Sequence, residues 1–407
     1  MDVSDVDLYD PDNFVAAVPH EMFATLRRDA PVYRHPRPDG SHFWCVTRHA
    51  DVVTVNRDAK TFSSWEKSAT GLDEMPEEQL ATQRMMMLNM DPPDHTKLRK
   101  IVNKGFTPRM IRDLMDHLVD ETRTIVDGIV ERGSCEFVEE AAAELPLIAI
   151  AEFLGVPVEE RKVIFELSNR LIGFDDPEFQ TTAEDGGAAA MEMYAFAQQL
   201  ADERRREPRN DIVSTLIAAD VDGDRLTELD FNLFFLLLAV AGNETTRNAI
   251  SHGMLALIEH PEQWQALRED PSLIDGAVEE ILRWATPVMY FRRTPTVDVE
   301  LGGELIPAGD LVSFWHISAN RDENVFSDPY TFDIRRSDVQ NTSHVAFGGG
   351  GPHFCLGANL ARAEIKVMLT ELLNRMETIE LAGPVRRLRS NFINGIKEMP
   401  VTFTPAS

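Results

Sequence analysis

The sequence has few cysteines, no signal peptide and no long hydrophobic run. Only Cys45, Cys135 and Cys355 occur among 407 residues, and their scatter excludes both a disulfide framework and a cysteine metal cluster. The N-terminal segment is acidic and lacks the basic and apolar regions of a signal peptide. The longest apolar run, residues 233–241, is shorter than the roughly 18 residues that a membrane span needs. We therefore expect a cytoplasmic protein with no integral membrane segment.

Basic residues are also scarce. The chain has 40 lysines and arginines against 68 aspartates and glutamates, which gives a formal net charge of −28. Such a charge repels the phosphates of nucleic acids and of anionic lipid surfaces. It argues against nucleic-acid binding as the main activity.

The composition is that of a globular protein, and helical periodicity dominates after the first hundred residues. No repeat or flexible linker divides the chain, so we predict a single domain, 1–407, of the mainly α (α+β) class. Short strands are predicted near 43–47, 297–301 and 311–315. Helices are predicted at 94–115, 116–132, 139–155, 158–172, 187–207, 227–259, 271–285 and 356–375.

The helix predicted from Thr227 to Glu259 carries an unusual polar cluster. Thr227 can cap a first turn that contains Asp230, and residues 233–241 are apolar on every side. Asn243, Glu244, Thr245 and Thr246 follow directly. Because an unpaired buried polar group costs about 1–3 kcal/mol, this cluster is either satisfied internally or functional.

A glycine-rich loop precedes the last predicted helix. It runs from Phe347 through four glycines to His353, Phe354 and Cys355. The N-terminal end of a helix favours a thiolate, and a thiolate is a suitable axial ligand for haem iron. The alternative is a cysteine that is only a small buried hydrophobic residue, which is how we interpret Cys45 and Cys135.

With these motifs the sequence resembles the cytochrome P450 family of haem-thiolate monooxygenases over nearly its whole length. The resemblance rests on the loop around Cys355, on residues 241–246 of the long helix, and on Glu280 and Arg283 of a Glu-x-x-Arg motif, for which Arg336 is the expected third member of a structural triad. It implies the P450 fold: a large helical lobe, a smaller β-rich lobe, and haem b between the long central helix and the Cys-loop helix.

The resemblance also implies which residues contact the haem. His95, Arg99, Arg293 and His353 match ligands of the propionates, and Ala241, Gly242, Phe347 and Gly357 match other haem contacts. On spacing alone, His95 and Arg99 would be a solvated helix face. Two departures occur: the family loop usually has its aromatic residue one position nearer the cysteine than Phe347, and Glu244 stands where many members have aspartate.

The implied reaction is hydroxylation of a C–H bond by O2. Glu244 and Thr245 are the expected proton-delivery residues, and Gly242 would leave room for O2 where the helix could bulge. The alternative for Thr245 is a hydrogen bond to the carbonyl one turn earlier. A peroxygenase that uses H2O2 and a non-catalytic haem-binding protein are the alternative functions.

A narrower resemblance, to actinobacterial hydroxylases of sterol side chains and methyl-branched lipids, implies a large apolar substrate, with terpenoids as another option. We expect some of a set of apolar residues to line its pocket, the alternative being that they are ordinary core residues. The set comprises Met85, Met86, Met87, Met90, Val240, Val288, Met289 and Phe291.

No reductase domain fits in the chain, so electrons would come from a separate ferredoxin. A basic stretch in this acidic chain is the expected docking site for an acidic ferredoxin, and the alternative is a solvated helix face. Arg99, within the same stretch, is assigned to the haem. The remaining basic residues are Lys97, Lys100, Lys104, Arg109 and Arg112.

Overall fold

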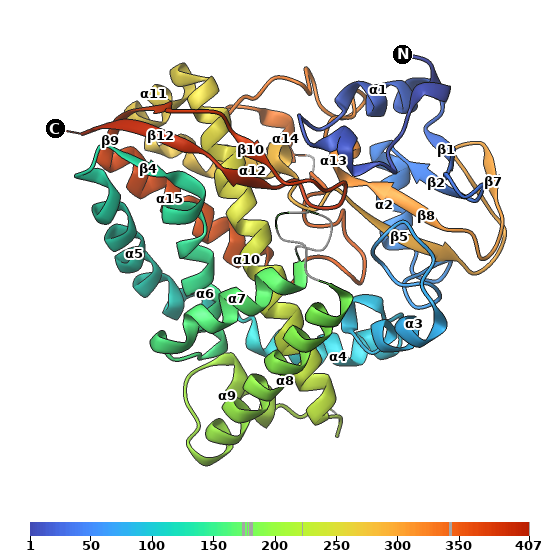
Figure 1. Ribbon diagram of the computed structural model, residues 1–407, viewed down its shortest axis with the longest axis horizontal. Coiled ribbons are helices and arrows are strands. Elements are labelled where there is room, and N and C mark those ends of the chain that lie inside the picture. Colours follow the sequence, from blue (N-terminus) through green and yellow to red (C-terminus); the bar gives the residue numbers. More distant parts are fainter. Residues whose placement is uncertain (173–175, 177, 179–181, 222, 342–343, 407) are drawn as a thin grey trace. The chain divides into compact units, whose positions relative to one another are not determined.

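The chain forms two compact units in this computed structural model, which describes residues 1–172, 176, 178, 182–221, 223–341 and 344–406 (Figure 1). Unit 1 comprises Met1–Thr96, Glu279–Cys355 and Arg387–Gly395; unit 2 comprises Lys97–Val278, Leu356–Arg386 and Ile396–Ser407. Three of the five boundaries between them fall within α4 (Asp94–Val102), α12 (Ile274–Ala285) and β10 (Arg386–Arg387), and the other two follow Cys355 and Gly395. We describe each unit separately.

Unit 1 is built around a five-stranded sheet of order β1-β2-β8-β5-β3. β2 pairs antiparallel with β1 and parallel with β8, and β5 joins β8 antiparallel with Tyr290 opposite Trp315. A separate hairpin pairs β6 with β7. The strands are β1 (Val32–Pro36), β2 (His42–Val46), β3 (Phe62–Ser63), β5 (Tyr290–Pro295), β6 (Val299–Leu301), β7 (Glu304–Ile306) and β8 (Val312–Trp315). The helices are α1 (His20–Asp29), α2 (His49–Arg57), α3 (Glu77–Arg84), α13 (His316–Ala319) and α14 (Ser337–Asn341).

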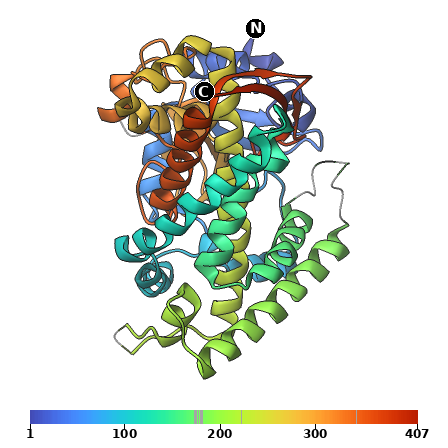
Figure 2. The same cartoon turned by 90° about the vertical axis from the view of Figure 1, so that its left-hand side faces the viewer.

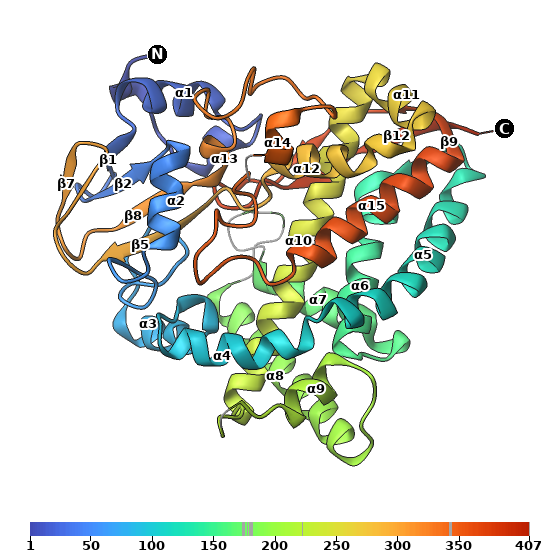
Figure 3. The ribbon, with the colours of Figure 1, turned by 180° about the vertical axis from the view of Figure 1, so that it is seen from behind.

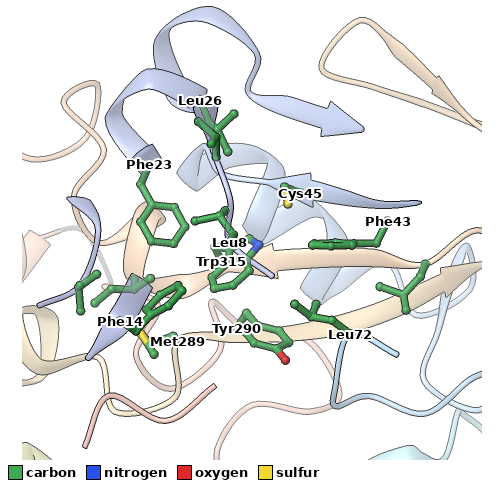
Figure 4. Packing of buried hydrophobic residues seen from close by; sticks show 14 residues of the cluster. Leu8, Phe14, Phe23, Leu26, Phe43, Cys45, Leu72, Met289, Tyr290 and Trp315 are labelled. Carbon is green, nitrogen blue, oxygen red and sulfur yellow. The ribbon is translucent and has the colours of Figure 1, made fainter. Parts of the chain in front are cut away.

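Aromatic side chains form the centre of one core cluster of unit 1. Trp315 is fully buried, and its ring lies 6.2 Å from Phe14, 5.2 Å from Phe23 and 4.6 Å from Tyr290 (Figure 4). Met289 packs in the same cluster. Large aromatic residues bury the most apolar area per residue, so this cluster stabilises the sheet that carries β5.

Unit 2 is mainly helical. Figure 1 shows α10 passing between the other helices; it packs against α6, α8 and α15. α8 crosses α10 near its first turns (Figure 2), and α15 lies alongside α5 (Figure 3). The helices are α5 (Pro108–Val130), α6 (Glu144–Leu154), α7 (Arg161–Ile172), α8 (Ala183–Arg206), α9 (Ile212–Ala218), α10 (Glu228–Glu259), α11 (Pro261–Glu269) and α15 (Ala358–Arg375). The strands β4 (Ser134–Glu136), β12 (Pro400–Pro405) and β9 (Met376–Leu381) form a sheet in that order, and β11 is Ile396–Glu398.

The long helix predicted from Thr227 is confirmed. The Thr227 hydroxyl accepts a hydrogen bond from the Asp230 amide, and the Asp230 carboxylate accepts one from the Thr227 amide, which is a complete capping box. The helix then continues for 32 residues. Among the described helices, none combines the length and apolarity that crossing a bilayer requires.

The prediction of a single helix over 94–115 is wrong. α4 ends at Val102, and a new helix begins at Pro108 after the Thr107 side chain accepts a hydrogen bond from the Met110 amide. Proline is favoured in the first turn of a helix, where its missing N–H costs no hydrogen bond. The strand β5 was not predicted, because the two arginines in Tyr290–Pro295 interrupt the apolar pattern by which a strand is recognised in a sequence.

Candidate functional site

The glycine loop of unit 1 needs its glycines. Gly348, Gly349, Gly350 and Gly351 have φ angles of 94°, 50°, 100° and 83°, which side chains other than glycine rarely adopt. A Cβ atom on Gly351 would lie 2.3 Å from the carbonyl oxygen of Asn56. The Cys355 amide donates to the Phe347 carbonyl at 3.0 Å and closes the loop.

Cys355 is the exposed thiol among the three cysteines, whereas Cys45 and Cys135 are buried. Burial raises the pKa of both buried thiols to about 12, so neither is a ready metal ligand. The helix that follows begins at Ala358 with Gly357 as its N-cap. Cys355 therefore precedes the N-cap by two residues instead of lying in the first turn.

Arg293 is a buried cation that suits an anionic ligand. It is 3% exposed, and its Nη1 donates to the carbonyl of Arg292 at 2.7 Å. Burial lowers the pKa of its guanidinium to about 10, and the charge of Asp91 opposes this shift. A guanidinium is a strong donor to carboxylates, so this residue fits the propionate of a haem.

The two predicted histidines lie together in unit 1. The rings of His95 and His353 are 4.1 Å apart, and His353 Nε2 lies 3.3 Å from the Ser64 hydroxyl. Asp91 fixes this region because its carboxylate accepts from the Ser64 amide at 2.8 Å and from the Ser63 hydroxyl. The imidazoles, the buried guanidinium and the exposed thiol form a donor set that fits a haem with a thiolate ligand and two carboxylates.

Arg99 lies one turn after His95 on α4. Its Nε donates to the Asn103 side chain at 3.2 Å.

The predicted docking residues lie on α4, on the short turn after it and on α5. All of them belong to unit 2, and all are exposed. Lys104 donates to the carbonyl of Asp220 at 2.5 Å, and Arg109 lies 3.8 Å from Asp113. The set comprises Lys97, Lys100, Lys104, Arg109 and Arg112.

The polar cluster of α10 is satisfied internally in part, because Asn243 Oδ1 is buried without a hydrogen-bond partner among the described residues. The Thr245 hydroxyl donates to the Ala241 carbonyl at 2.7 Å, so the alternative bond to the previous turn is present. Glu244 Oε1 accepts from Asn248 Nδ2 at 2.9 Å and from Arg247 Nη2. Asn248 in turn accepts from the Ile396 amide at 3.1 Å. Ala241 is exposed and Thr245 is half-buried, so this face of the helix is accessible.

Gly242 has a packing role that the sequence did not predict. A Cβ atom there would lie 2.9 Å from Cδ1 and 3.1 Å from Cγ1 of Ile150 on α6. α10 continues as a regular helix through this position, so the expected bulge is absent from this described segment. The missing side chain allows α6 and α10 to approach each other, so Gly242 has a packing role in addition to the predicted one.

The structure brings the three residues of the predicted triad together within unit 1. Arg283 donates to the Glu280 carboxylate from Nε at 2.7 Å and from Nη2 at 2.8 Å, and Arg336 Nε donates to it at 3.3 Å. The Asp333 amide adds a fourth donor at 3.0 Å. Glu280 and Arg283 are fully buried, so this is a closed structural network.

Most of the predicted pocket residues are accessible, with one exception. Met85 is exposed, and Met86, Met87, Met90, Val240, Val288 and Phe291 are partly exposed. Met289 is 1% exposed and packs in the core of unit 1 (Figure 4), so its assignment to the pocket is wrong. Met289 shares this core cluster with its neighbour Tyr290 and with Trp315.

Several residues with direct contacts to the site were missed. Arg247 and Asn248 contact Glu244, and Ser64 contacts His353. The spacings of three and four residues after Glu244 could have identified the first two, because such positions are neighbours on a helix. Ser64 could not be found, since it is distant from His353 in sequence.

Comparison with known proteins decides the family. The family model for cytochrome P450 matches residues 163–398, which is more than half of the chain. The chain belongs to the cytochrome P450 family. P450s are haem enzymes, and this chain is a P450 monooxygenase with the P450 fold.

Curated P450 relatives are similar over nearly the whole chain. A steroid C26-monooxygenase of Rhodococcus jostii (strain RHA1) is 46% identical over 409 residues, covering 98% of this chain and 85% of the relative. A methyl-branched lipid omega-hydroxylase of Mycobacterium tuberculosis (strain ATCC 25618 / H37Rv) is 42% identical over 392 residues, covering 94% of this chain and 90% of the relative.

A solved P450 is also similar. Cytochrome P450 CYP268A2 of Mycobacterium marinum, in complex with pseudoionone, is 40% identical, with a TM-score of 0.89 and 98% of both chains covered.

Proposed function

We propose that this P450 binds haem b through Cys355 and hydroxylates the terminal carbon of a sterol side chain or a methyl-branched lipid. The activities of the two curated relatives, steroid C26-monooxygenase and methyl-branched lipid omega-hydroxylase, support this substrate class. The observation that carries the proposal is the exposed thiol of Cys355 at the end of the glycine loop, in a chain whose other cysteines are buried. The whole chain, 1–407, serves as one P450 domain. The small number of cysteines agrees with a reducing compartment such as the cytoplasm.

The proposed cofactor contacts are the residues that match the haem-binding motifs of the family. Arg293, His353, His95 and Arg99 bind the propionates through charged and neutral N–H donors. Phe347, Gly357, Ala241 and Gly242 are the remaining proposed contacts. A bound haem with a cysteine thiolate supplies the oxygen-activating chemistry, because the thiolate donates electron density that favours O–O cleavage.

Glu244 and Thr245 deliver protons. Thr245 can exchange its bond to the Ala241 carbonyl for one to a reacting oxygen atom, since its hydroxyl lies on an accessible face of α10. Glu244 relays protons and is held in place by Arg247 and Asn248. A positioned carboxyl and hydroxyl are a common pair for general acid catalysis.

The substrate contacts are apolar in this proposal. Met86, Met87, Val240, Val288 and Phe291 remain candidates because each is partly accessible. Methionine is flexible and polarisable, so it adapts to a long hydrocarbon. A panel of sterols, branched lipids and terpenoids, followed through the change in haem absorbance on binding, tests this class. Tight binding confined to small polar molecules would contradict it.

The cysteine assignment has its own test. The reduced carbonyl complex of the wild type should show the spectrum of a thiolate-ligated haem, and Cys355→His should abolish it. Cys135→Ser is the matched control, since that thiol is buried with a raised pKa. A thiolate spectrum that survives in Cys355→His would show that another ligand holds the iron.

The electron donor is proposed to be an acidic ferredoxin that docks on the basic stretch of α4 and α5. The triple change of Lys100, Lys104 and Arg109 to glutamate should slow reduction about tenfold at low salt, because it removes electrostatic steering. The difference should shrink at high ionic strength. The control reverses three exposed cations outside the stretch, Lys60, Arg206 and Arg335. Equal reduction rates for both triple variants would refute this docking site.

A further inference from the structure

The last turn of α2 supports the glycine loop of unit 1. Arg57 Nε donates to the Gly349 carbonyl at 3.0 Å. A Cβ atom on Gly350 would lie 2.8 Å from the same Nε, and one on Gly351 would lie 3.0 Å from the Cα of Arg57. The space beside two of the glycines is therefore occupied by α2.

Backbone hydrogen bonds lie at both ends of the loop. The Gly348 amide donates to Val345 at 2.8 Å, the Phe354 amide to Gly351 at 3.3 Å, and the Cys355 amide to Phe347 at 3.0 Å. Four consecutive glycines lose more conformational entropy on ordering than any other residues would. A loop of this composition needs an external contact to keep one shape.

We propose that Arg57 is a positioning residue that holds the glycine loop in the conformation that presents Cys355 to the haem iron. This inference rests on the proposed function, in which Cys355 is the axial ligand. Arg57 acts through the Gly349 carbonyl and touches neither the thiol nor the substrate.

The neighbouring Asn56 makes the support rigid. Asn56 is buried, and its Nδ2 donates to His316 Nε2 at 3.2 Å. Burial lowers the pKa of His316 to about 3, so the imidazole is neutral and its Nε2 can accept this bond. The end of α2 is thus joined to the residue that follows β8, and the position of Arg57 does not depend on the loop alone.

Lysine cannot replace Arg57 in this role. The Nε–H group that meets Gly349 belongs to the planar guanidinium, which also fills the space beside Gly350. A lysine ammonium keeps the charge but lies at the end of a longer flexible stem. Arg57→Lys therefore keeps the positive charge and removes the hydrogen bond to Gly349, so the two contributions can be told apart.

The experiment measures amide hydrogen exchange of residues 347–357 in the haem-loaded full chain. Arg57→Ala and Arg57→Lys should both speed exchange in this segment by about two- to tenfold, the effect of losing one hydrogen bond. The same variants should lose part of the thiolate-type spectrum of the reduced carbonyl complex. Lys60→Ala, which removes an exposed cation three residues later, is the control and should match the wild type.

The other possible outcomes contradict either this proposal or the proposed function. Wild-type exchange in Arg57→Ala, or in Arg57→Lys alone, would overturn the proposal, because the Nε–H bond would then not hold the loop. Equal acceleration by Lys60→Ala would also overturn it. A wild type without the thiolate spectrum would instead refute Cys355 as ligand, and with it the proposed function.

Discussion

Two glutamates of this chain form ion pairs with an arginine three residues later on a helix, and their surroundings differ. Glu280 and Arg283 are both 0% exposed, whereas the side chains of Glu244 and Arg247 are 6% and 15% exposed. Glu280 accepts from Arg283, Arg336 and the Asp333 amide. The Glu244 carboxylate accepts from Arg247 and Asn248, and Glu244 lies next to Thr245.

The difference shows that the Glu-x-x-Arg spacing alone does not identify a role. A fully enclosed pair cannot lose one partner without leaving a buried charge unpaired, so Glu280 is fixed. A pair at the edge of the buried region can exchange its partners with solvent at a lower cost. Glu280 therefore stabilises the fold of unit 1, whereas Glu244 can take part in proton transfer.

The largest expected effect is on Glu280. Glu280→Gln leaves Arg283 and Arg336 without a carboxylate and should lower the free energy of unfolding by about 3–5 kcal/mol. Chemical denaturation measures this loss, and Glu300→Gln at an exposed position of the same unit is the control. If both variants unfold at the wild-type midpoint, the network is not structural.

Glu244→Gln should affect turnover more than stability. We expect product formation to slow by about 100-fold, the lower end of general acid–base effects, with about 1–3 kcal/mol lost in stability because Arg247 and Asn248 lose a charged partner. Steady-state kinetics and denaturation measure the two quantities, and Glu259→Gln at the end of the same helix is the control. A stability loss as large as that of Glu280→Gln would remove the distinction between the two pairs.

Thr245→Ala should uncouple electron consumption from hydroxylation. The product formed per NADPH should fall about tenfold, as loss of one strong hydrogen bond would give. Stability should hardly change, because the Thr245 hydroxyl bonds only within its own helix turn. Thr245→Ser keeps the hydroxyl and should retain coupling. Unchanged product per NADPH in the alanine variant would exclude the proton-delivery role.

The smallest expected effect is at Gly242. Gly242→Ala gains about 1 kcal/mol in helix propensity and loses about 1–3 kcal/mol through the clash with Ile150, so the variant should be about 1 kcal/mol less stable. Ile150→Val removes the Cδ1 atom that would lie closest and should reverse this loss. A variant of full stability that is uncoupled would instead favour a role for Gly242 in leaving room for O2.

The sequence predicted motifs better than contacts. The capped helix from Thr227, the glycine loop and the grouping of Glu280, Arg283 and Arg336 could be predicted because local hydrogen-bonding rules and ordered motifs identify them. Met289 could not be placed, because it is buried by core residues that are distant from it in sequence. Ile150 beside Gly242, and Arg57 beside Gly349, are tertiary contacts that no local pattern encodes.

The most direct test of the account is isotopic analysis of the product formed with labelled O2. A sterol or methyl-branched lipid, ferredoxin, its reductase and NADPH should give a product hydroxylated at the terminal carbon with one oxygen atom from O2. Cys355→His should give no product. An oxygen atom derived from water, or turnover only with added H2O2, would contradict the account.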